Sequence, residues 1–265
     1  MRVYATMIRL SIADAIQYRV ESAIYFLYEV LPPIMMAFVW LTVYQEQSTV
    51  AGYALGEMLA YTVGVMVLRA IVTVHVEWAL DYNIRQGLLS TQLIRPFNYW
   101  AFLFADAIAW KAVRLLLMVP VLIACLYWLG PDMGGINISL ERLPALAVSV
   151  ALAYVVCFFL KLCLGFIGFW TNDIIGITTL YEVVANIFGG ILIPIALLPD
   201  WLQVVARLLP IQAIYSVPLS ILLGKSEGAD PWWGIALQLG WIVVLWALAL
   251  VLWRAGLRQY ESVGG

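Results

Sequence analysis

Residues 189–223 read GGILIPIALLPDWLQVVARLLPIQAIYSVPLSILL, an apolar stretch with only two charged residues, Asp200 and Arg207. Four prolines interrupt it: Pro194, Pro199, Pro210 and Pro218. A membrane-spanning helix needs about 20 uninterrupted apolar residues, whereas proline removes a backbone donor and biases the preceding residue away from helix. The pattern therefore predicts a re-entrant hairpin over residues 186–223, which enters the membrane, turns and leaves on the side from which it came. Such backbone must face protein or a water-filled path, because lipid cannot satisfy its polar groups.

Within this hairpin, the sequence Pro199-Asp200-Trp201 predicts the start of a short helix that ends near Leu209. Asp200 is the expected N-cap, since a carboxylate there can accept from the first free amides of a helix. An alternative interpretation is an ordinary interfacial helix that Trp201 anchors in the headgroup layer.

The composition predicts an all-α integral membrane protein. Of the 265 residues, 65% are hydrophobic and only 11% are charged, whereas soluble domains have about 25% charged residues. Long apolar runs favour helices over an outer-membrane barrel, and a net charge of −2 gives no reason to expect nucleic acid as a partner. We expect one transmembrane domain over residues 1–265. Its first segment, residues 1–20, is expected to form an amphipathic helix that lies in the membrane interface.

Six spans follow from the apolar runs. They are expected near residues 22–44, 53–79, 112–129, 144–170, 174–188 and 232–253. With the amino terminus inside, nine lysines and arginines near the span ends would lie on the inner side and three on the outer side. This bias predicts a multi-pass protein of the inner membrane with both termini in the cytoplasm.

Two basic residues fall inside predicted spans, Arg69 and Lys161. For Arg69 the alternatives are a snorkelling or helix-pairing arginine and a residue that lines a cavity between subunits. Lys161 is expected near the inner interface, with a cavity-facing position as the alternative. A Gly165-x-x-Gly168 pair in the same span predicts close helix packing. We recognise no cluster of polar residues at one depth, and therefore expect no catalytic site in the membrane interior.

Three segments in the chain resemble the type-2 permeases of ATP-binding-cassette (ABC) exporters. They are the Gly-Gly, Leu-Pro-Asp-Trp-Leu and Leu-Leu-Pro series of the hairpin, Ile84-Arg85-Gln86-Gly87-Leu88 followed by Leu93-Ile94-Arg95-Pro96, and the ending Gly256-Leu257-Arg258-Gln259-Tyr260-Glu261-Ser262-Val263-Gly264-Gly265. The resemblance covers nearly the whole chain.

The resemblance implies that residues 81–99 are the cytoplasmic coupling segment, which docks into an ATPase subunit. Its docking residues would be Arg85, Gly87, Leu88, Leu89, Leu93 and Arg95. The outer hairpin would be shaped by Gly189, Gly190, Pro194, Pro199, Asp200 and Trp201. The alternative for residues 81–99 is an ordinary cytoplasmic loop.

The same resemblance implies a permease subunit that exports a hydrophobic or amphipathic drug, lipid or glycan. A second permease, identical or a sister chain, would form the path with it, and two ABC ATPase subunits would bind ATP and magnesium. The chain itself should not be an enzyme: Gly224-Lys225-Ser226 lacks the first glycine of a phosphate loop, since position 219 is Leu219. One histidine and no clustered cysteines or carboxylates predict no metal site and no cofactor in this chain. The alternatives are an ion-coupled secondary transporter and a non-transporting membrane scaffold or biogenesis factor.

Overall fold

A computed structural model describes residues 19–133, 140–225 and 230–260, and it is helical throughout most of that part of the chain. The predicted interfacial helix over 1–20 lies almost wholly outside the described residues. The longer helices are α2 (Arg19–Val43), α3 (Leu55–Val72), α6 (Tyr99–Leu129), α7 (Leu143–Phe166), α8 (Ile175–Phe188) and α12 (Pro231–Gln259). The shorter ones are α4 (Val76–Arg85), α5 (Leu89–Leu93), α9 (Asp200–Arg207), α10 (Pro210–Ile214) and α11 (Ser216–Leu223). The 3-10 turns η1 (Leu140–Arg142), η2 (Ile167–Phe169) and η3 (Ile195–Leu197) complete them.

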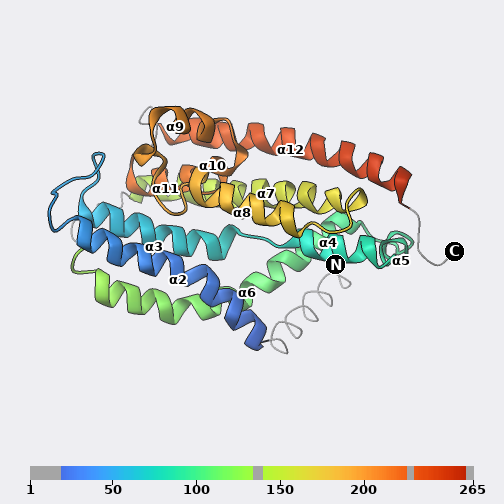
Figure 1. Cartoon of the computed structure of the whole chain (residues 1–265), viewed down its shortest axis with the longest axis horizontal. Helices are drawn as coiled ribbons and strands as arrows, with labels where there is room; N and C mark the ends of the chain where they lie inside the picture. The colour runs from blue at the N-terminus through green and yellow to red at the C-terminus, as the bar shows by residue number, and fades with distance from the viewer. Residues whose placement is uncertain (1–18, 134–139, 226–229, 261–265) are drawn as a thin grey trace.

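The helices form a bundle with α7 at its centre. This helix packs against α3, α4, α10, α11 and α12, while α2, α3 and α6 pack against one another beside it (Figure 1). The side-chain amide of Gln238 on α12 donates to the carbonyl oxygens of Ser149 on α7 and Ala213 on α10, at 3.0 and 2.8 Å. This fully buried amide joins three helices where the bundle is otherwise apolar.

The two ends of the bundle carry different segments. One end, which we call the α5 end, contains α5 and the last turns of α12 (right in Figure 1). The other end, which we call the Lys225 end, contains Lys225. The amine of Lys225 donates to the carbonyl oxygen of Gly52 and pairs with Glu57, both at 2.6 Å. The α2–α3 connection and the end of α11 therefore meet at the Lys225 end, where α6 also ends (Figure 1).

Three described helical stretches are long and apolar enough to cross a membrane: Leu55–Arg85, Leu140–Phe169 and Pro231–Gln259. The other predicted spans correspond to α2, α6 and α8, which are 25, 31 and 14 residues long. Two details differ from prediction. The second span is not one helix, since α3 and α4 are separate, and α6 runs unbroken from Tyr99 instead of beginning near residue 112.

Candidate functional site

The break between α3 and α4 is the centre of the candidate site. Thr73, Val74 and His75 are not helical, although no glycine or proline is present. Alternating β-branched residues occupy this stretch, and they lose side-chain freedom in a helix and tolerate extended backbone. Thr73 is extended, with φ −63° and ψ 127°. The break exposes a carbonyl oxygen of Thr73 that the amine of Lys111 on α6 reaches at 2.6 Å.

Burial explains why this lysine is needed. Thr73 and Val74 are both nearly fully buried, so water cannot replace the helical hydrogen bond. Non-helical backbone at membrane depth persists only where protein or a wet cavity satisfies it. The hydroxyl groups of Thr73 and Tyr215 also lie 3.2 Å apart, which links the break to the residue between α10 and α11.

A chain of charged side chains surrounds the break. Arg114 on α6 pairs with Glu29 on α2 at 2.8 Å. The imidazole of His75 lies between two carboxylates, 3.5 Å from Glu29 and 3.7 Å from Glu77 on α4. We call Glu29, His75, Glu77, Arg114, Lys161 and Glu182 the buried ion network; the side chains of His75 and Glu182, at its edge, are 35% and 30% exposed.

Lys161 is its most enclosed member, with 1% of its side chain exposed. Its amine donates to Glu77 at 2.8 Å and to Glu182 on α8 at 3.1 Å, and it lies 4.1 Å from the centre of the Tyr181 ring. Lys161 therefore pairs α7 with α4 and α8. The structure shows Lys161 enclosed by packed helices, and its expected position near the inner interface stays a prediction.

Arg69 differs from the network residues. It lies on α3 one turn before the break and is only 5% exposed, and its Nε has no hydrogen-bond partner among the described residues. A buried charge without full compensation is costly. The geometry is compatible with both interpretations of Arg69, an arginine that pairs helices and a residue that lines a cavity between subunits.

The polar residues converge because they lie at one depth. Thr73, Lys111 and Lys161 are each 18 residues from the helix end nearest Lys225, namely Leu55, Leu129 and Leu143. At 1.5 Å per residue this is about 27 Å along each helix. Our expectation that no polar cluster shares a depth was wrong. Counting residues from the span ends would have revealed the cluster, whereas inspecting each span separately did not.

The network can act as a joint between helices. It connects α2, α4, α6, α7 and α8 through ion pairs, and the break lets α4 change direction relative to α3. Among the described residues no group of histidine, cysteine and carboxylate side chains is arranged to hold a metal ion. The buried Oε2 atoms of Glu29 and Glu77 have no hydrogen-bond partner among the described residues.

Close packing fixes α4 against α7. A Cβ added at Gly165 would lie 2.8 Å from the side chain of Leu80 and 3.0 Å from the Cα of Glu77. One added at Gly168 would lie 3.1 Å from the carboxylate of Asp81. The predicted close approach at this glycine pair is therefore confirmed, and its partner is α4.

Residues 81–99 continue α4 into a tight corner. Arg85 pairs with Asp81 and donates to the carbonyl oxygen of Asn172 at 3.4 Å. Gly87 has φ +70°, a conformation that favours glycine. It turns the chain into α5. Leu89 is fully buried, which ties α5 to the bundle.

The other side chains of this corner face outward. Leu88 and Leu93 are about two-fifths exposed and Ile94 is 84% exposed, and Arg95 is exposed as well. The apolar side chains give α5 an outward surface that the rest of the described chain does not cover.

The segment after α8 begins at two glycines. Gly190 has φ +77°, and its carbonyl oxygen accepts from the hydroxyl of Tyr61 on α3. Pro194 precedes η3, and Pro199 precedes α9. Trp201 on α9 is 68% exposed.

Asp200 does not cap α9 as predicted. The helix begins at Asp200 itself, and its N-cap is Pro199, without a side-chain hydrogen bond. The carbonyl oxygen of Pro199 accepts from the amides of Leu202 and Gln203 at 2.8 and 3.1 Å. The extended backbone of Pro199 thus already occupies the cap position, which moves the carboxylate one residue into the helix.

The family model described as ABC-2 family transporter protein matches residues 30–264. No curated protein matches the chain. The matched range includes the break, the buried ion network, α5 and the segment from Gly189 to Leu223.

Proposed function

The chain belongs to the ABC-2 transporter family, and from this premise we propose that it is the permease subunit of an ABC exporter. Membership in this family supports the interpretation that the chain is a membrane subunit and depends on separate ATPase subunits. We further propose that the substrate is hydrophobic or amphipathic, that it moves outward, and that two ATPase subunits bind the ATP and magnesium.

The observation that carries the proposal is the outward surface of α5. Leu93, Ile94 and Arg95 form an exposed apolar and basic corner at the end of α5. Exposed apolar side chains that gather at one place mark interaction sites. In our proposal this corner docks into the ATPase, and Gly87 and Leu89 hold its shape.

Movement would travel from α5 to the membrane through α4. Because α4 is closely packed on α7 at Gly165 and separated from α3 at His75, a push on α5 tilts α4 about the break. The ion pairs of Glu77 with Lys161 and of Lys161 with Glu182 would pass this tilt to α7 and α8. We propose that α8 in turn displaces the segment that starts at Gly189.

A six-span topology completes the proposal. Helices α2, α3 with α4, α6, α7, α8 and α12 would cross the inner membrane, with both termini and α5 in the cytoplasm. Residues 186–223 would form the re-entrant hairpin, because the contacts of Gly189 with Ile211 and Tyr215 bring the two arms of that segment together. Its outer turn would include Pro199 and Trp201.

The path would run between two permeases, identical or sister chains. Two apolar stripes support this placement, because each has several exposed side chains at helical spacing. One stripe on α2 consists of Leu31, Met35 and Phe38, and the other on α8 consists of Leu180, Val183 and Ile187. A second permease could cover part of these faces and leave the rest to the substrate.

The test is ATP-dependent transport by the reconstituted complex. The tagged chain is purified in mild detergent with its partners, and uptake of lipophilic dyes into inside-out vesicles is measured with ATP, with ATP and vanadate, and with an imposed proton gradient. Uptake that needs ATP and stops with vanadate supports the proposal. Uptake driven by the gradient alone contradicts it.

Proton-coupled secondary transport is the second candidate, because the buried ion network contains His75 between two carboxylates. Ionisable residues inside a membrane are often part of a proton relay. That candidate predicts that His75→Gln abolishes gradient-driven uptake, whereas the ABC proposal predicts no gradient-driven uptake in either chain.

A further inference from the structure

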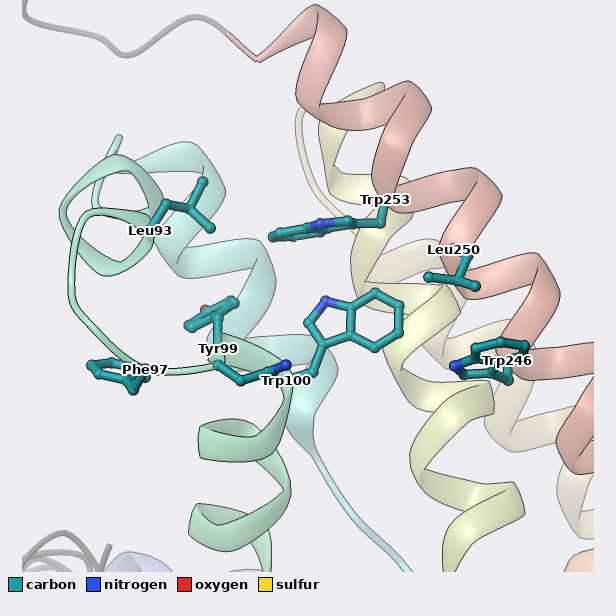
Figure 2. Close-up of a pocket in the computed structure, with 8 residues that line it drawn as sticks. Leu93, Phe97, Tyr99, Trp100, Trp246, Leu250 and Trp253 are labelled. Carbon is teal, nitrogen blue, oxygen red and sulfur yellow. The ribbon is translucent and has the colours of Figure 1, made fainter. Parts of the chain in front are cut away.

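A cavity of about 420 Å³ lies at the α5 end, between the start of α6 and the last turns of α12. Five aromatic side chains line most of it: Phe97, Tyr99, Trp100, Trp246 and Trp253. Figure 2 shows Trp100 and Trp253 reaching toward each other from α6 and α12, with Trp246 and Leu250 further along α12. We call this space the aromatic slot.

The inner wall of the aromatic slot is rigid. Trp253 stacks on Tyr99 with ring centres 6.3 Å apart and meets Trp100 edge-on at 6.0 Å. Behind it, Phe166 lies 5.1 Å from Trp253. The hydroxyl of Tyr99 accepts from the side-chain amide of Asn83 at 3.0 Å. Such packing keeps the slot formed without a ligand, which lowers the entropy lost on binding.

The segments that line the slot carry basic but no acidic side chains, and none of these basic residues is itself part of the lining. Residues 86–105 and 231–260, which contribute all of its lining, contain no aspartate or glutamate. They contain three arginines, Arg95, Arg254 and Arg258, all exposed. None of the three guanidinium groups forms an ion pair with a described residue. Arg254 follows Leu250 by four residues and Arg258 follows Arg254 by four, so they neighbour one another beyond the slot on α12.

The slot opens onto an apolar helix face. Only 22% of the most apolar window of α12 is buried, and Trp246, Val243 and Val251 are about half or more exposed. In a membrane protein such a face contacts lipid tails. A ligand that reaches the slot from this side needs an apolar part that lies along α12 and an anionic group that pairs with arginine at the end of the helix.

We propose that the aromatic slot binds an anionic glycerophospholipid from the leaflet at the α5 end. One acyl chain lies along α12 and enters between Trp246 and Trp100. The phosphate is bound by Arg254 and Arg258, one and two helical turns beyond Leu250 on α12. Basic pockets beside membrane helices favour anionic headgroups in this way, and aromatic rings suit the boundary between tail and headgroup. The lipid would brace α12 against the corner that joins α5 to α6.

The test uses native mass spectrometry of the delipidated chain, titrated with phosphatidylglycerol or with phosphatidylcholine that has the same acyl chains. We expect tighter binding of phosphatidylglycerol. Arg254→Gln and Arg258→Gln should each weaken it about fivefold, the effect of one basic residue near a charged surface, with phosphatidylcholine unchanged. Trp246→Ala, at a half-exposed position, should weaken both lipids.

The matched controls lie at the Lys225 end, where Arg142 and Trp233 are also exposed. Arg142→Gln and Trp233→Ala should leave both affinities unchanged. Equal binding of the two lipids, or equal losses in the control variants, would overturn the site. Release of bound phosphatidylglycerol by a purified ATPase partner would assign the slot to that protein instead. The lipid titration itself needs neither ATP nor transport, so equal binding of the two lipids would remove this site without contradicting the proposed function.

Discussion

Replacing Lys161 by methionine tests whether the buried ion network holds the bundle together. Methionine keeps most of the side-chain volume and removes the charge, so Glu77 and Glu182 lose their shared cation. Glu77 is only 1% exposed, and breaking a pair at such a site costs about 3–5 kcal/mol, because the remaining charge stays buried. Glu182 adds less, since 30% of its side chain is exposed.

The chain contains a matched control for this change. Lys225 also pairs with a glutamate, Glu57, at 2.6 Å, and also lies over a tyrosine ring, Tyr53, at 3.9 Å. The side chains of this second pair are 26% and 35% exposed. Water therefore screens it, and Lys225→Met should cost at most about 1 kcal/mol.

The assay is unfolding in mixed micelles, followed by tryptophan fluorescence as the fraction of denaturing detergent rises. Lys161→Met should unfold at a clearly lower fraction than wild type, and Lys225→Met close to wild type. Adding Glu77→Gln to Lys161→Met should recover part of the loss, because it removes the uncompensated charge. Equal stability of the two lysine variants would refute the reasoning. If Lys161→Met does not insert, Glu182→Gln serves as the milder probe and should fall between them.

Three further variants test the corner, the helix packing and the segment after α8. Gly87→Pro should uncouple ATP hydrolysis from vesicle uptake while the chain still inserts, because proline cannot adopt φ +70°. Gly165→Ala should destabilise the chain by about 1–3 kcal/mol in the micelle assay, since the new methyl group would overlap α4, whereas Gly176→Ala, with open space around it, should stay within about 0.5 kcal/mol. Tyr61→Phe removes the donor to the carbonyl oxygen of Gly190 and should cost about 1–3 kcal/mol and speed proteolysis near that residue.

Gly176→Ala is the control for Gly165→Ala, and the other two variants have controls as well. Gly52→Pro introduces the same strain as Gly87→Pro, since Gly52 has φ +78°, but at the Lys225 end; equal uncoupling by both would remove the docking role from α5. Tyr127→Phe changes a tyrosine that is 79% exposed, and proteolysis that matches Tyr61→Phe would contradict the role of the buried hydroxyl.

Much of the fold could be predicted because long apolar runs form membrane-spanning helices. The positions of α2, α7 and α12 follow from such runs, and the corner before α5 follows from Gly87. The capping role of Asp200 was predicted from residue type alone and is wrong, since the carbonyl oxygen of Pro199 already accepts the first amides of α9.

The break and the buried ion network could not be predicted from local pattern. Thr73 and His75 lack the glycine or proline that usually interrupts a helix, and the break persists because Lys111, 38 residues further along the chain, satisfies it. The partner of Lys161 on α4 lies 84 residues away. Such contacts depend on how the helices pack, so only their common depth was available in the sequence.

The central claim is that α5 is where an ATPase subunit docks. A photoreactive amino acid at position 94, where Ile94 is 84% exposed, would test it in the membranes of the native host, with position 140 as the control, where Leu140 is 80% exposed at the Lys225 end. The account predicts that illumination links an ABC ATPase to position 94 and not to position 140. An ATPase linked equally to both positions, or a chain that links to no ATPase from position 94, would contradict it.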